Sequence, residues 1–347
     1  MTQSILMLPG DGIGPEVAAA ARLCLETVAS KQGFELSFDT AAFGGHGIDE
    51  CGASLPDETL KKAQASDAIF LGAVGGPQWD KAPERPEQGL LAIRKILGLF
   101  ANLRPLKVFS GLEHLSPLKS DYVAGADLLI VRELTGGLYF GEKREGDDVA
   151  FDGCTYSAEE VDRIARIAFE AAQRRKGRVM SVDKANVLAT SRLWRKRVEA
   201  VAKDYSDVAL DHMLVDAAAM KLVTHPTSFD VIVTENLFGD ILSDEASVIS
   251  GSIGLQGSAS MGAEGPGLFE PIHGSAPDIA GQNIANPSGA IASAAMLLRH
   301  GLGQSGAADQ LETALEAELK TGNPTGDLGG TAKCDEFAAK VAERIAA

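Results

Sequence analysis

The sequence is poor in cysteine, and its cysteines are not closely spaced. Cys24, Cys51, Cys154 and Cys334 lie far apart among 347 residues, and the histidines form no cluster. A zinc ribbon needs ligands in closely spaced pairs, so this class does not fit. Scattered cysteines instead favour reduced thiols in a cytoplasmic protein.

Long apolar runs and positive charge are also scarce. No segment approaches 18 continuous apolar residues, and the apolar residues 5–8 have no basic flank, which argues against a spanning helix and a signal peptide. Asp and Glu number 48 against 32 Lys and Arg, giving a net charge of −16. Because this charge repels phosphates and anionic lipids, we predict no nucleic-acid partner and no membrane partner.

The length and the hydrophobic pattern predict a two-domain α/β protein. Hydrophobic residues make up 45% of the chain, and a domain has about 150 residues, so 347 residues suggest two domains. Short apolar runs alternate with segments of helical period, as in α/β folds. We expect strands at 5–8, 68–74, 127–131, 179–182, 208–212 and 229–234, and helices at 15–30, 157–174 and 286–301.

Two segments depart from this alternation. Residues 129–140 contain the turn Thr135-Gly136-Gly137 between apolar stretches, which predicts a β-hairpin. Residues 148–156 form a second strand-like piece, which we interpret as an arm that reaches a partner subunit.

The glycine-rich segment 9–16, Pro-Gly-Asp-Gly-Ile-Gly-Pro-Glu, follows a predicted strand and opens a helix. Its glycines are spaced G-x-G-x-G, one residue short of the dinucleotide fingerprint, and Glu16 would face the phosphates. We therefore interpret the segment as a tight structural turn that lines a cleft, and not as a Rossmann motif.

Three arginines are candidate anion ligands. Arg94 shares one face of a predicted helix with Glu87, Leu90 and Leu91, which fits either a core face or a pocket for a branched alkyl group beside a carboxylate. Arg104 and Arg132 follow in the next segments. Each alone is ordinary surface charge, but together they would clamp a polycarboxylate through bidentate hydrogen bonds.

Charged residues also follow several predicted strands. Lys184, Asp216, Asp240 and Asp244 all lie beyond carboxyl ends, where ligands bind in open α/β sheets. Asp240 and Asp244 lie on one helix face. This face is either exposed to solvent or binds a cation between the two carboxylates. Carboxylate oxygens with few histidines nearby favour Mg²⁺ or Mn²⁺.

The segment 273–281 and Asn286 form a candidate nucleotide site. Its small residues let the backbone approach a flat ligand, and Asp278 is able to accept hydrogen bonds from a ribose diol. The charge of Asp278 would repel a 2′-phosphate, which favours NAD over NADP. A lone histidine such as His273 is more often a structural hydrogen-bonding residue than a catalyst.

With these motifs in order, the chain resembles the isocitrate/isopropylmalate family of β-decarboxylating hydroxyacid dehydrogenases. The resemblance rests on segments 8–16, 87–95, 102–105, 132–142, 183–187, 234–244 and 273–286. It implies a two-domain α/β fold with a mixed sheet that is not a Rossmann fold. Residues 1–99 and 252–347 would form the NAD-binding domain, and 100–251 the dimerisation and metal/substrate domain.

The resemblance also implies roles for individual residues in a homodimer with shared active sites. Lys184 and Asp216 would act in the neighbouring subunit's site. The implied catalytic residues are Tyr139 and Lys184, and the implied metal ligands are Asp216, Asp240 and Asp244. The implied substrate residues are Arg94, Arg104, Arg132, Asp216, Leu90, Leu91 and Val187. The implied NAD residues are Gly75, Gly76, Glu87, Glu270, His273, Gly274, Ser275, Ala276, Pro277, Asp278, Ile279 and Asn286.

The implied reaction is the NAD- and metal-dependent oxidation and decarboxylation of a 3-alkylmalate, 3-isopropylmalate in leucine biosynthesis, to 4-methyl-2-oxopentanoate and CO₂. An isopropyl group suits Leu90, Leu91 and Val187. The alternatives are a D-malate or tartrate dehydrogenase of the same family, or a non-catalytic regulatory subunit. Intact Tyr139 and Lys184 argue against the last.

Overall fold

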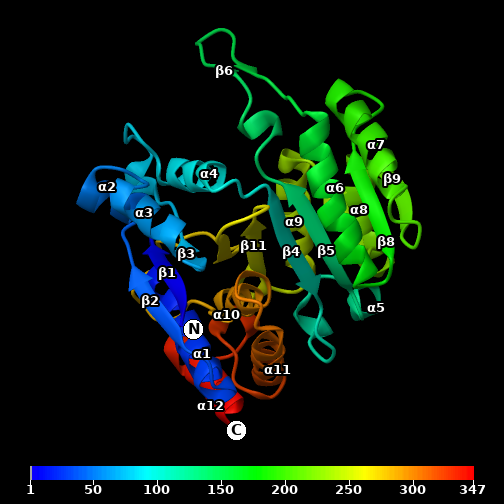
Figure 1. Ribbon diagram of the computed structural model, residues 1–347. Coiled ribbons are helices and arrows are strands. Elements are labelled where there is room, and N and C mark those ends of the chain that lie inside the picture. The colour runs from blue at the N-terminus through cyan, green and yellow to red at the C-terminus, as the bar shows by residue number, and fades with distance from the viewer. Residues whose placement is uncertain (1) are drawn as a thin grey trace. The chain divides into compact units, whose positions relative to one another are not determined.

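The structure is a computed structural model that describes residues 2–347, and these residues form two compact units. One unit comprises Met1–Leu99 and Ser252–Ala347, and the other comprises Phe100–Gly251. The chain therefore begins and ends in the same unit (Figure 1). Within residues 2–347, no helix has both the length and the apolar character needed to cross a membrane.

The terminal unit is built around a mixed sheet. Its strands are β1 (Gln3–Gly10), β2 (Leu36–Thr40), β3 (Ala68–Ala73), β11 (Gly257–Met261) and β12 (Gly267–Pro271), in the spatial order β2-β1-β3-β12-β11. All neighbours are parallel except β11, which is antiparallel to β12. Neither this order nor the antiparallel strand matches a Rossmann domain, which confirms the prediction of a mixed, non-Rossmann α/β fold.

Helices of this unit pack against the sheet and against each other. They are α1 (Gly14–Gln32), α2 (Gly44–Cys51), α3 (Asp57–Ala65), α4 (Pro86–Ile96), α10 (Ser288–Met296), α11 (Ser305–Thr321) and α12 (Cys334–Ala346). Short 3₁₀ turns occur at Pro77–Trp79, Ile253–Leu255 and Gly326–Leu328. Pro15 lies in the first turn of α1, the helix predicted at 15–30, where its missing N–H costs no hydrogen bond. A π-helical turn, Leu297–Gly301, ends the predicted alanine-rich helix.

The strands of the central unit also run in mixed directions. Its strands are β4 (Ala101–Lys107), β5 (Asp127–Glu133), β8 (Arg178–Asp183), β9 (Ala209–Leu214) and β10 (Val231–Thr234), ordered β4-β5-β10-β8-β9. β4 is antiparallel to β5, and the other pairs are parallel. The helices are α5 (Ser120–Val123), α6 (Ala158–Gln173), α7 (Ala189–Ala202), α8 (Val215–Thr224) and α9 (Asn236–Ile249). Its 3₁₀ turns are Glu113–Leu115, Gly137–Tyr139 and Pro226–Ser228.

Side chains alternate between the two faces of the sheet along the central strands, and helices pack on both of these faces. Leu128, Ile130, Val182 and Ile232 are buried in one cluster with apolar residues of α8 and α9. The intervening strand residues point to the opposite face, and α6 packs against β5, β8 and β10. Burial on both faces explains why these strands are short and nearly continuous apolar runs.

The hairpin predicted at 129–140 is wrong. β5 ends at Glu133, and the chain then forms the 3₁₀ turn Gly137–Tyr139 in place of a second strand. Glu133 accepts hydrogen bonds from the backbone N–H groups of Thr135 and Gly136, so the chain wraps around a buried carboxylate instead of turning back along β5. The apolar pattern alone contained no sign of this buried acid.

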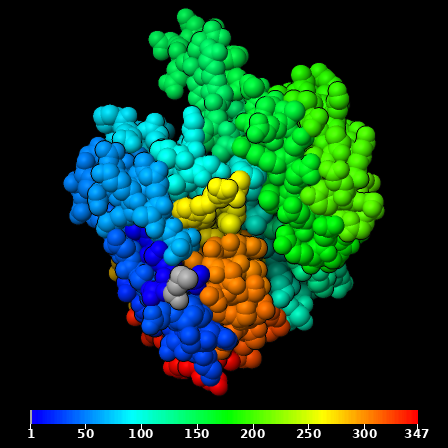
Figure 2. Space-filling view, in the orientation of Figure 1, coloured from blue at the N-terminus to red at the C-terminus, as the bar shows by residue number. Residues whose placement is uncertain are grey.

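The strand-like piece predicted at 148–156 is part of a small two-stranded hairpin. β6 (Lys143–Arg144) pairs antiparallel with β7 (Phe151–Asp152), and residues 143–152 are exposed. The hairpin projects from the central unit in both the ribbon and the space-filling view (Figures 1 and 2). After it, Ser157 and Glu160 form a capping box that opens α6, the helix predicted at 157–174.

Candidate active site

Tyr139 and Asp240 form the centre of the polar site in the central unit. Tyr139 ends the 3₁₀ turn after β5, and its hydroxyl donates a 2.6 Å hydrogen bond to Asp240 Oδ2 in the first turns of α9. Burial and the hydrogen bond to the Asp240 carboxylate raise the pKa of Tyr139 to about 12. The phenol is therefore protonated at neutral pH and is able to donate a proton.

Arg132, the penultimate residue of β5, lies beside this pair. Its guanidinium contacts Asp240 Oδ1 and lies 5.7 Å from the centroid of the Tyr139 ring. Burial alone would raise the pKa of Asp240, but the positive charge of Arg132 and the hydrogen bond from Tyr139 hold it below the ordinary value. Asp240 is thus an ionised carboxylate at neutral pH.

Arg104 joins the second acidic residue of α9 to the same region. Its Nη1 donates to Ser243 Oγ at 2.6 Å and to Asp244 Oδ1 at 3.0 Å, and its Nε donates to Asn102 Oδ1 at 2.9 Å. Asp244 is largely exposed, with 59% of its side chain accessible. The structure therefore brings Arg104, Arg132, Tyr139, Asp240 and Asp244 together, as the sequence predicted for part of the site.

Lys184 and Asp216 form a separate pair beyond β8 and β9. Lys184 Nζ donates to Asp216 Oδ1 at 2.8 Å, and this hydrogen bond lowers the pKa of the Asp216 carboxyl. Across residues 2–347, no three acidic, histidine or cysteine side chains gather closely enough to hold a metal ion. Asp216 therefore does not complete a metal site with Asp240 and Asp244 within a single chain.

Sequence reasoning missed two buried carboxylates beneath the Tyr139 turn. Glu133 is fully buried and also accepts hydrogen bonds from Thr135 Oγ1 and Arg163. Glu235 caps α9 by accepting from the backbone N–H of Phe238, and burial raises the pKa of both acids. Glu235 directly precedes Asn236 in the segment 234–244, so only its position next to that motif could have drawn attention to it.

In the terminal unit, Arg94 is buried on α4 and is held by Glu270 of β12. Arg94 Nη2 lies 2.5 Å from Glu270 Oε1, whereas Arg94 Nε is buried without a hydrogen-bond partner among the described residues. A buried guanidinium N–H with no acceptor is costly unless a ligand supplies one. Leu90 and Leu91 on the same helix are half-buried, so they are available to line a pocket.

The predicted nucleotide loop is anchored by the glycine-rich turn before α1. The N–H of Ile13 donates to Ser275 O at 2.8 Å, and a Cβ on Gly12 would lie 2.0 Å from the same oxygen. The carboxylate of Asp11 accepts hydrogen bonds from the backbone N–H groups of Gly45, His46 and Gly75. The turn is thus a structural support for the loop, in agreement with our interpretation of the motif.

The loop itself presents unsatisfied and strained groups. His273 Nε2 is buried without a partner among the described residues, and burial lowers the pKa of the imidazole. Ala276 has a φ of 40°, a conformation that L-residues adopt at a cost and that often marks a ligand site. At the end of the loop, Asn286 Nδ2 donates a 3.0 Å hydrogen bond to Asp327 Oδ2. The remaining predicted loop residues, Gly274, Pro277, Asp278 and Ile279, lie between these positions.

Gly76 and Glu87, next to Gly75, line a depression in the terminal unit. The cavity has a volume of about 340 Å³ and is also lined by Trp79, Asp80 and Arg85. Gly75 has a φ of 106°, and a Cβ there would lie 2.6 Å from Glu87 Oε1, so the position requires glycine.

Comparisons with known proteins agree with this architecture. The sequence model described as isocitrate/isopropylmalate dehydrogenase matches residues 4–341. The chain is 58% identical to a 3-isopropylmalate dehydrogenase of Oleidesulfovibrio alaskensis, with 99% of this chain and 100% of the relative covered. It is 54% identical to the Listeria innocua protein of the same name, with 99% of each covered.

Solved structures give the same result. An isocitrate dehydrogenase from Methylococcus capsulatus superposes with a TM-score of 0.90 at 35% identity, over 99% of this chain and 100% of that one. A β-decarboxylating dehydrogenase from Thermococcus kodakarensis superposes with a TM-score of 0.83 at 38% identity, over 99% and 96%. The fold and these similarities define a decarboxylating dehydrogenase of the α/β class. The chain belongs to the isocitrate/isopropylmalate dehydrogenase family.

Proposed function

We propose that this chain catalyses the NAD-dependent oxidative decarboxylation of 3-isopropylmalate to 4-methyl-2-oxopentanoate and CO₂ in leucine biosynthesis, as a cytoplasmic homodimer. The observation that carries the proposal is the arrangement of Tyr139 and Arg132 on Asp240. A proton donor, a cation for a carboxylate and an ionised carboxylate all meet at the carboxyl end of β5.

The substrate would be held by arginines through its two carboxylates. Arg94 has a buried N–H that lacks an acceptor, which fits a ligand carboxylate. Arg104 and Arg132 contribute guanidinium groups whose planar geometry suits bidentate binding. Leu90 and Leu91 offer apolar surface for the isopropyl group, with the exposed Val187 as a further apolar candidate.

The residues also fit a hard divalent cation and NAD. Asp240 and Asp244 supply carboxylate oxygens on one face of α9, and Asp216 of a second chain would complete the set that Mg²⁺ or Mn²⁺ prefers. When bound, the metal would polarise the C2 hydroxyl and NAD⁺ would accept the hydride. His273 and the loop that ends at Asn286 would hold the cofactor, because the loop has a buried nitrogen without a partner.

The chain's own groups would then move the protons. Lys184 would take the proton from the C2 hydroxyl, and Tyr139 would give its proton to C3 after CO₂ leaves. Because the pKa of Tyr139 is raised, its phenol stays protonated until the proton is transferred to C3. The arginines would hold the reacting carbons in place, which lowers the entropic cost of the reaction.

The separation of Lys184 and Asp216 from the Asp240 group supports a shared active site. Met220 and Val223 on α8 and Ile241 and Val248 on α9 are apolar and exposed. Ile241, Asp244 and Val248 are spaced i, i+3 and i+7, so they lie on one face of α9. An apolar face that carries a metal-binding aspartate suits a boundary between two copies of the chain.

A kinetic substrate panel tests the proposal. With NAD⁺ and Mg²⁺, kcat/KM should be highest for 3-isopropylmalate among 3-isopropylmalate, D-malate, tartrate and isocitrate, and chelation of divalent metals should abolish turnover. A higher value for D-malate or tartrate would change the substrate assignment and leave the reaction class intact. Because an apolar pocket discriminates by about 1–3 kcal/mol per methylene, slow turnover of D-malate is expected.

Lys184→Met tests the proposed base. We expect at least a ~100-fold loss of kcat with unchanged NADH binding, measured by titration of NADH fluorescence. Lys203→Met, an exposed lysine at the end of α7, is the matched control and should retain full activity. Equal activity of the two variants would remove Lys184 from the mechanism.

A further inference from the structure

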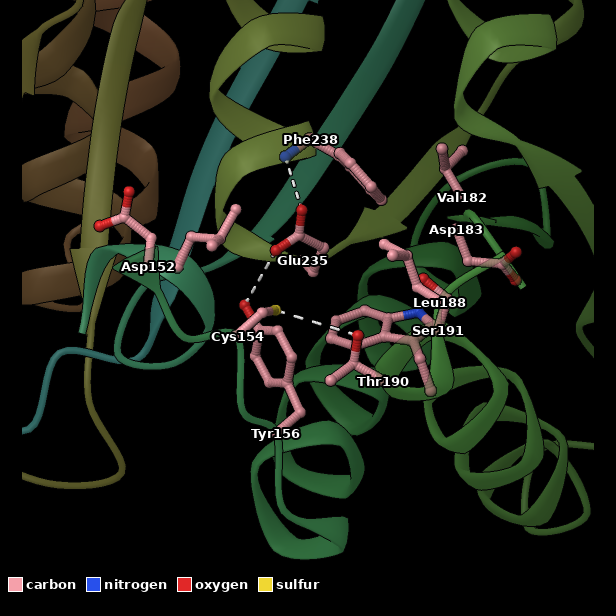
Figure 3. A pocket seen from close by; sticks show the side chains of 12 residues that line it. Asp152, Cys154, Tyr156, Val182, Asp183, Leu188, Thr190, Ser191, Glu235 and Phe238 are labelled. Carbon is pink, nitrogen blue, oxygen red and sulfur yellow. Dashed lines mark hydrogen bonds between the residues drawn. The ribbon is translucent and has the colours of Figure 1, made fainter. Parts of the chain in front are cut away.

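A cavity of about 260 Å³ lies inside the central unit, between the base of the projecting hairpin, β8, α7 and the start of α9. Figure 3 shows its lining, in which the Cys154 thiol contacts Thr190 and the Tyr156 hydroxyl bonds to Glu235. Its lining residues are Leu138, Asp152, Cys154, Tyr156, Val182, Asp183, Leu188, Thr190, Ser191, Trp194, Glu235 and Phe238. Arg104, Arg132, Tyr139, Lys184 and the three aspartates of the proposed site are not among them.

The lining of the cavity combines buried and exposed residues. Tyr156, Val182 and Trp194 are buried, with Trp194 only 2% exposed, whereas Asp152 and Leu188 are exposed. The Tyr156 and Trp194 rings meet edge to face, with centroids 5.6 Å apart, and form a rigid aromatic wall. A small molecule in the cavity would thus be surrounded by apolar and aromatic groups.

One buried polar group of the cavity lining lacks a hydrogen-bond partner. The indole Nε1 of Trp194 is buried and makes no hydrogen bond with any described residue. An indole N–H is a donor and cannot accept, so a partner must bring an acceptor atom. A buried donor left without an acceptor costs stability, and a bound acceptor would recover that cost.

The charges around the cavity exclude an anionic occupant. No lysine, arginine or histidine lines it, while the three acids Asp152, Asp183 and Glu235 do. Asp183 is neutralised by a bidentate pair with Arg195, at 2.9 and 3.0 Å, but Glu235 would oppose a second negative charge in a desolvated space. A neutral molecule meets no such opposition.

We propose that this cavity is a binding site for a small neutral organic molecule that carries an apolar ring and one hydrogen-bond acceptor directed at the Trp194 indole. Ligand cavities usually measure about 300–1,000 Å³, so this one takes a molecule of about one ring. The lining contains none of the residues proposed for the substrate, metal and NAD sites, and the test below measures binding and not activity.

Indole N–H signals in NMR spectra of the full-length protein test the proposal, because the chain has two tryptophans, Trp79 and Trp194. The probes are acetophenone, cumene and benzoate, which share a shape but differ in acceptor and charge. Acetophenone should shift the Trp194 signal saturably and leave that of Trp79 unchanged. Cumene should bind at least about fivefold more weakly because it lacks the acceptor, and benzoate should not bind.

Two variants locate the site. Cys154→Phe fills the cavity and should weaken acetophenone binding at least tenfold, whereas Cys51→Phe, the same change at the exposed end of α2, should not. Trp194→Phe keeps the apolar wall and should erase the preference for acetophenone over cumene in ligand-observed spectra. An unshifted Trp194 signal, equal binding of cumene, binding of benzoate, or full binding to Cys154→Phe would overturn the proposal. A cavity filled by water or by a second copy of the chain would give the first of these results.

Discussion

Asn236 accepts two hydrogen bonds from Arg132, from Nε at 3.0 Å and from Nη2 at 2.8 Å. Its amide nitrogen donates in turn to Gly136 O at 3.2 Å, and its side chain is almost fully buried. One residue thus fixes the guanidinium that contacts Asp240 and the turn that presents Tyr139. Asn236 lies within the segment 234–244, yet no sequence rule distinguishes it there from an ordinary helix-start asparagine.

Asn236→Ala should disturb the orientation of Arg132. The substitution removes the acceptor of two buried N–H groups, so we expect a loss of about 1–3 kcal/mol in the free energy of unfolding, measured by urea denaturation. KM for the malate substrate should rise about tenfold, equivalent to about 1.4 kcal/mol.

Asn236→Asp separates the two contacts of the side chain. The carboxylate still accepts from Arg132 but does not donate to Gly136 O, so KM should stay near that of the wild type while kcat falls through the displaced Tyr139 turn. If Asn236→Ala leaves KM unchanged, Asn236 does not position Arg132 for substrate binding.

The shared active site predicts complementation between two inactive variants. Tyr139→Phe and Lys184→Met should each be inactive as homodimers. In a hybrid dimer, one of the two sites combines an intact Tyr139 with an intact Lys184 from the other chain. Differently tagged variants, co-expressed and purified as the hybrid, should therefore show about half the wild-type rate per dimer. An inactive hybrid would mean that both residues act within one chain.

The exposed apolar face of α8 and α9 predicts a subunit interface. Ile241→Lys places a charge in the middle of this face and should raise the dissociation constant of the dimer at least about 100-fold. Sedimentation velocity at micromolar concentration would show monomers, and turnover would fall with the dimer fraction. Leu23→Lys, at an exposed leucine of α1 in the other unit, is the control and should leave the dimer intact.

Much of the fold could be predicted from the sequence, because its elements carry local signals. Apolar runs placed β5, β8, β9 and β10 within a few residues but did not mark β4. Pro15 and Ser157 marked helix starts, and the unusual glycine spacing excluded a Rossmann turn. The prediction of a hairpin at 129–140 failed because Glu133 is buried and accepts hydrogen bonds from the backbone that follows it. Burial of a carboxylate depends on tertiary contacts that a local pattern does not contain.

The candidate site was predictable where residues follow strands directly. Arg132 and Lys184 are at the carboxyl ends of β5 and β8, so strand positions sufficed to select them. The supporting contacts were not predictable, because Glu270 is 176 residues from Arg94 and Asn236 is 104 from Arg132. Pairing over such separations is set by sheet order, which periodicity does not reveal.

His273 predicts a dependence of stability on pH. Burial lowers the pKa of its imidazole in the folded protein, whereas in the unfolded chain the pKa is near its ordinary value of about 6.5. The unfolded state therefore binds more protons than the folded state as pH falls through that value, and stability is lost toward acid. Above the unfolded pKa, the imidazole is neutral in both states and this loss is absent.

Urea denaturation of the wild type and of His273→Asn at pH 7, 6 and 5 measures this effect. Asparagine does not titrate, so the variant should lose less unfolding free energy than the wild type between pH 7 and pH 5. The difference is bounded by about 1.4 kcal/mol per pH unit for one proton. Parallel losses in the two proteins would show that His273 titrates alike in the folded and unfolded states, and the acid sensitivity would then have to come from other groups.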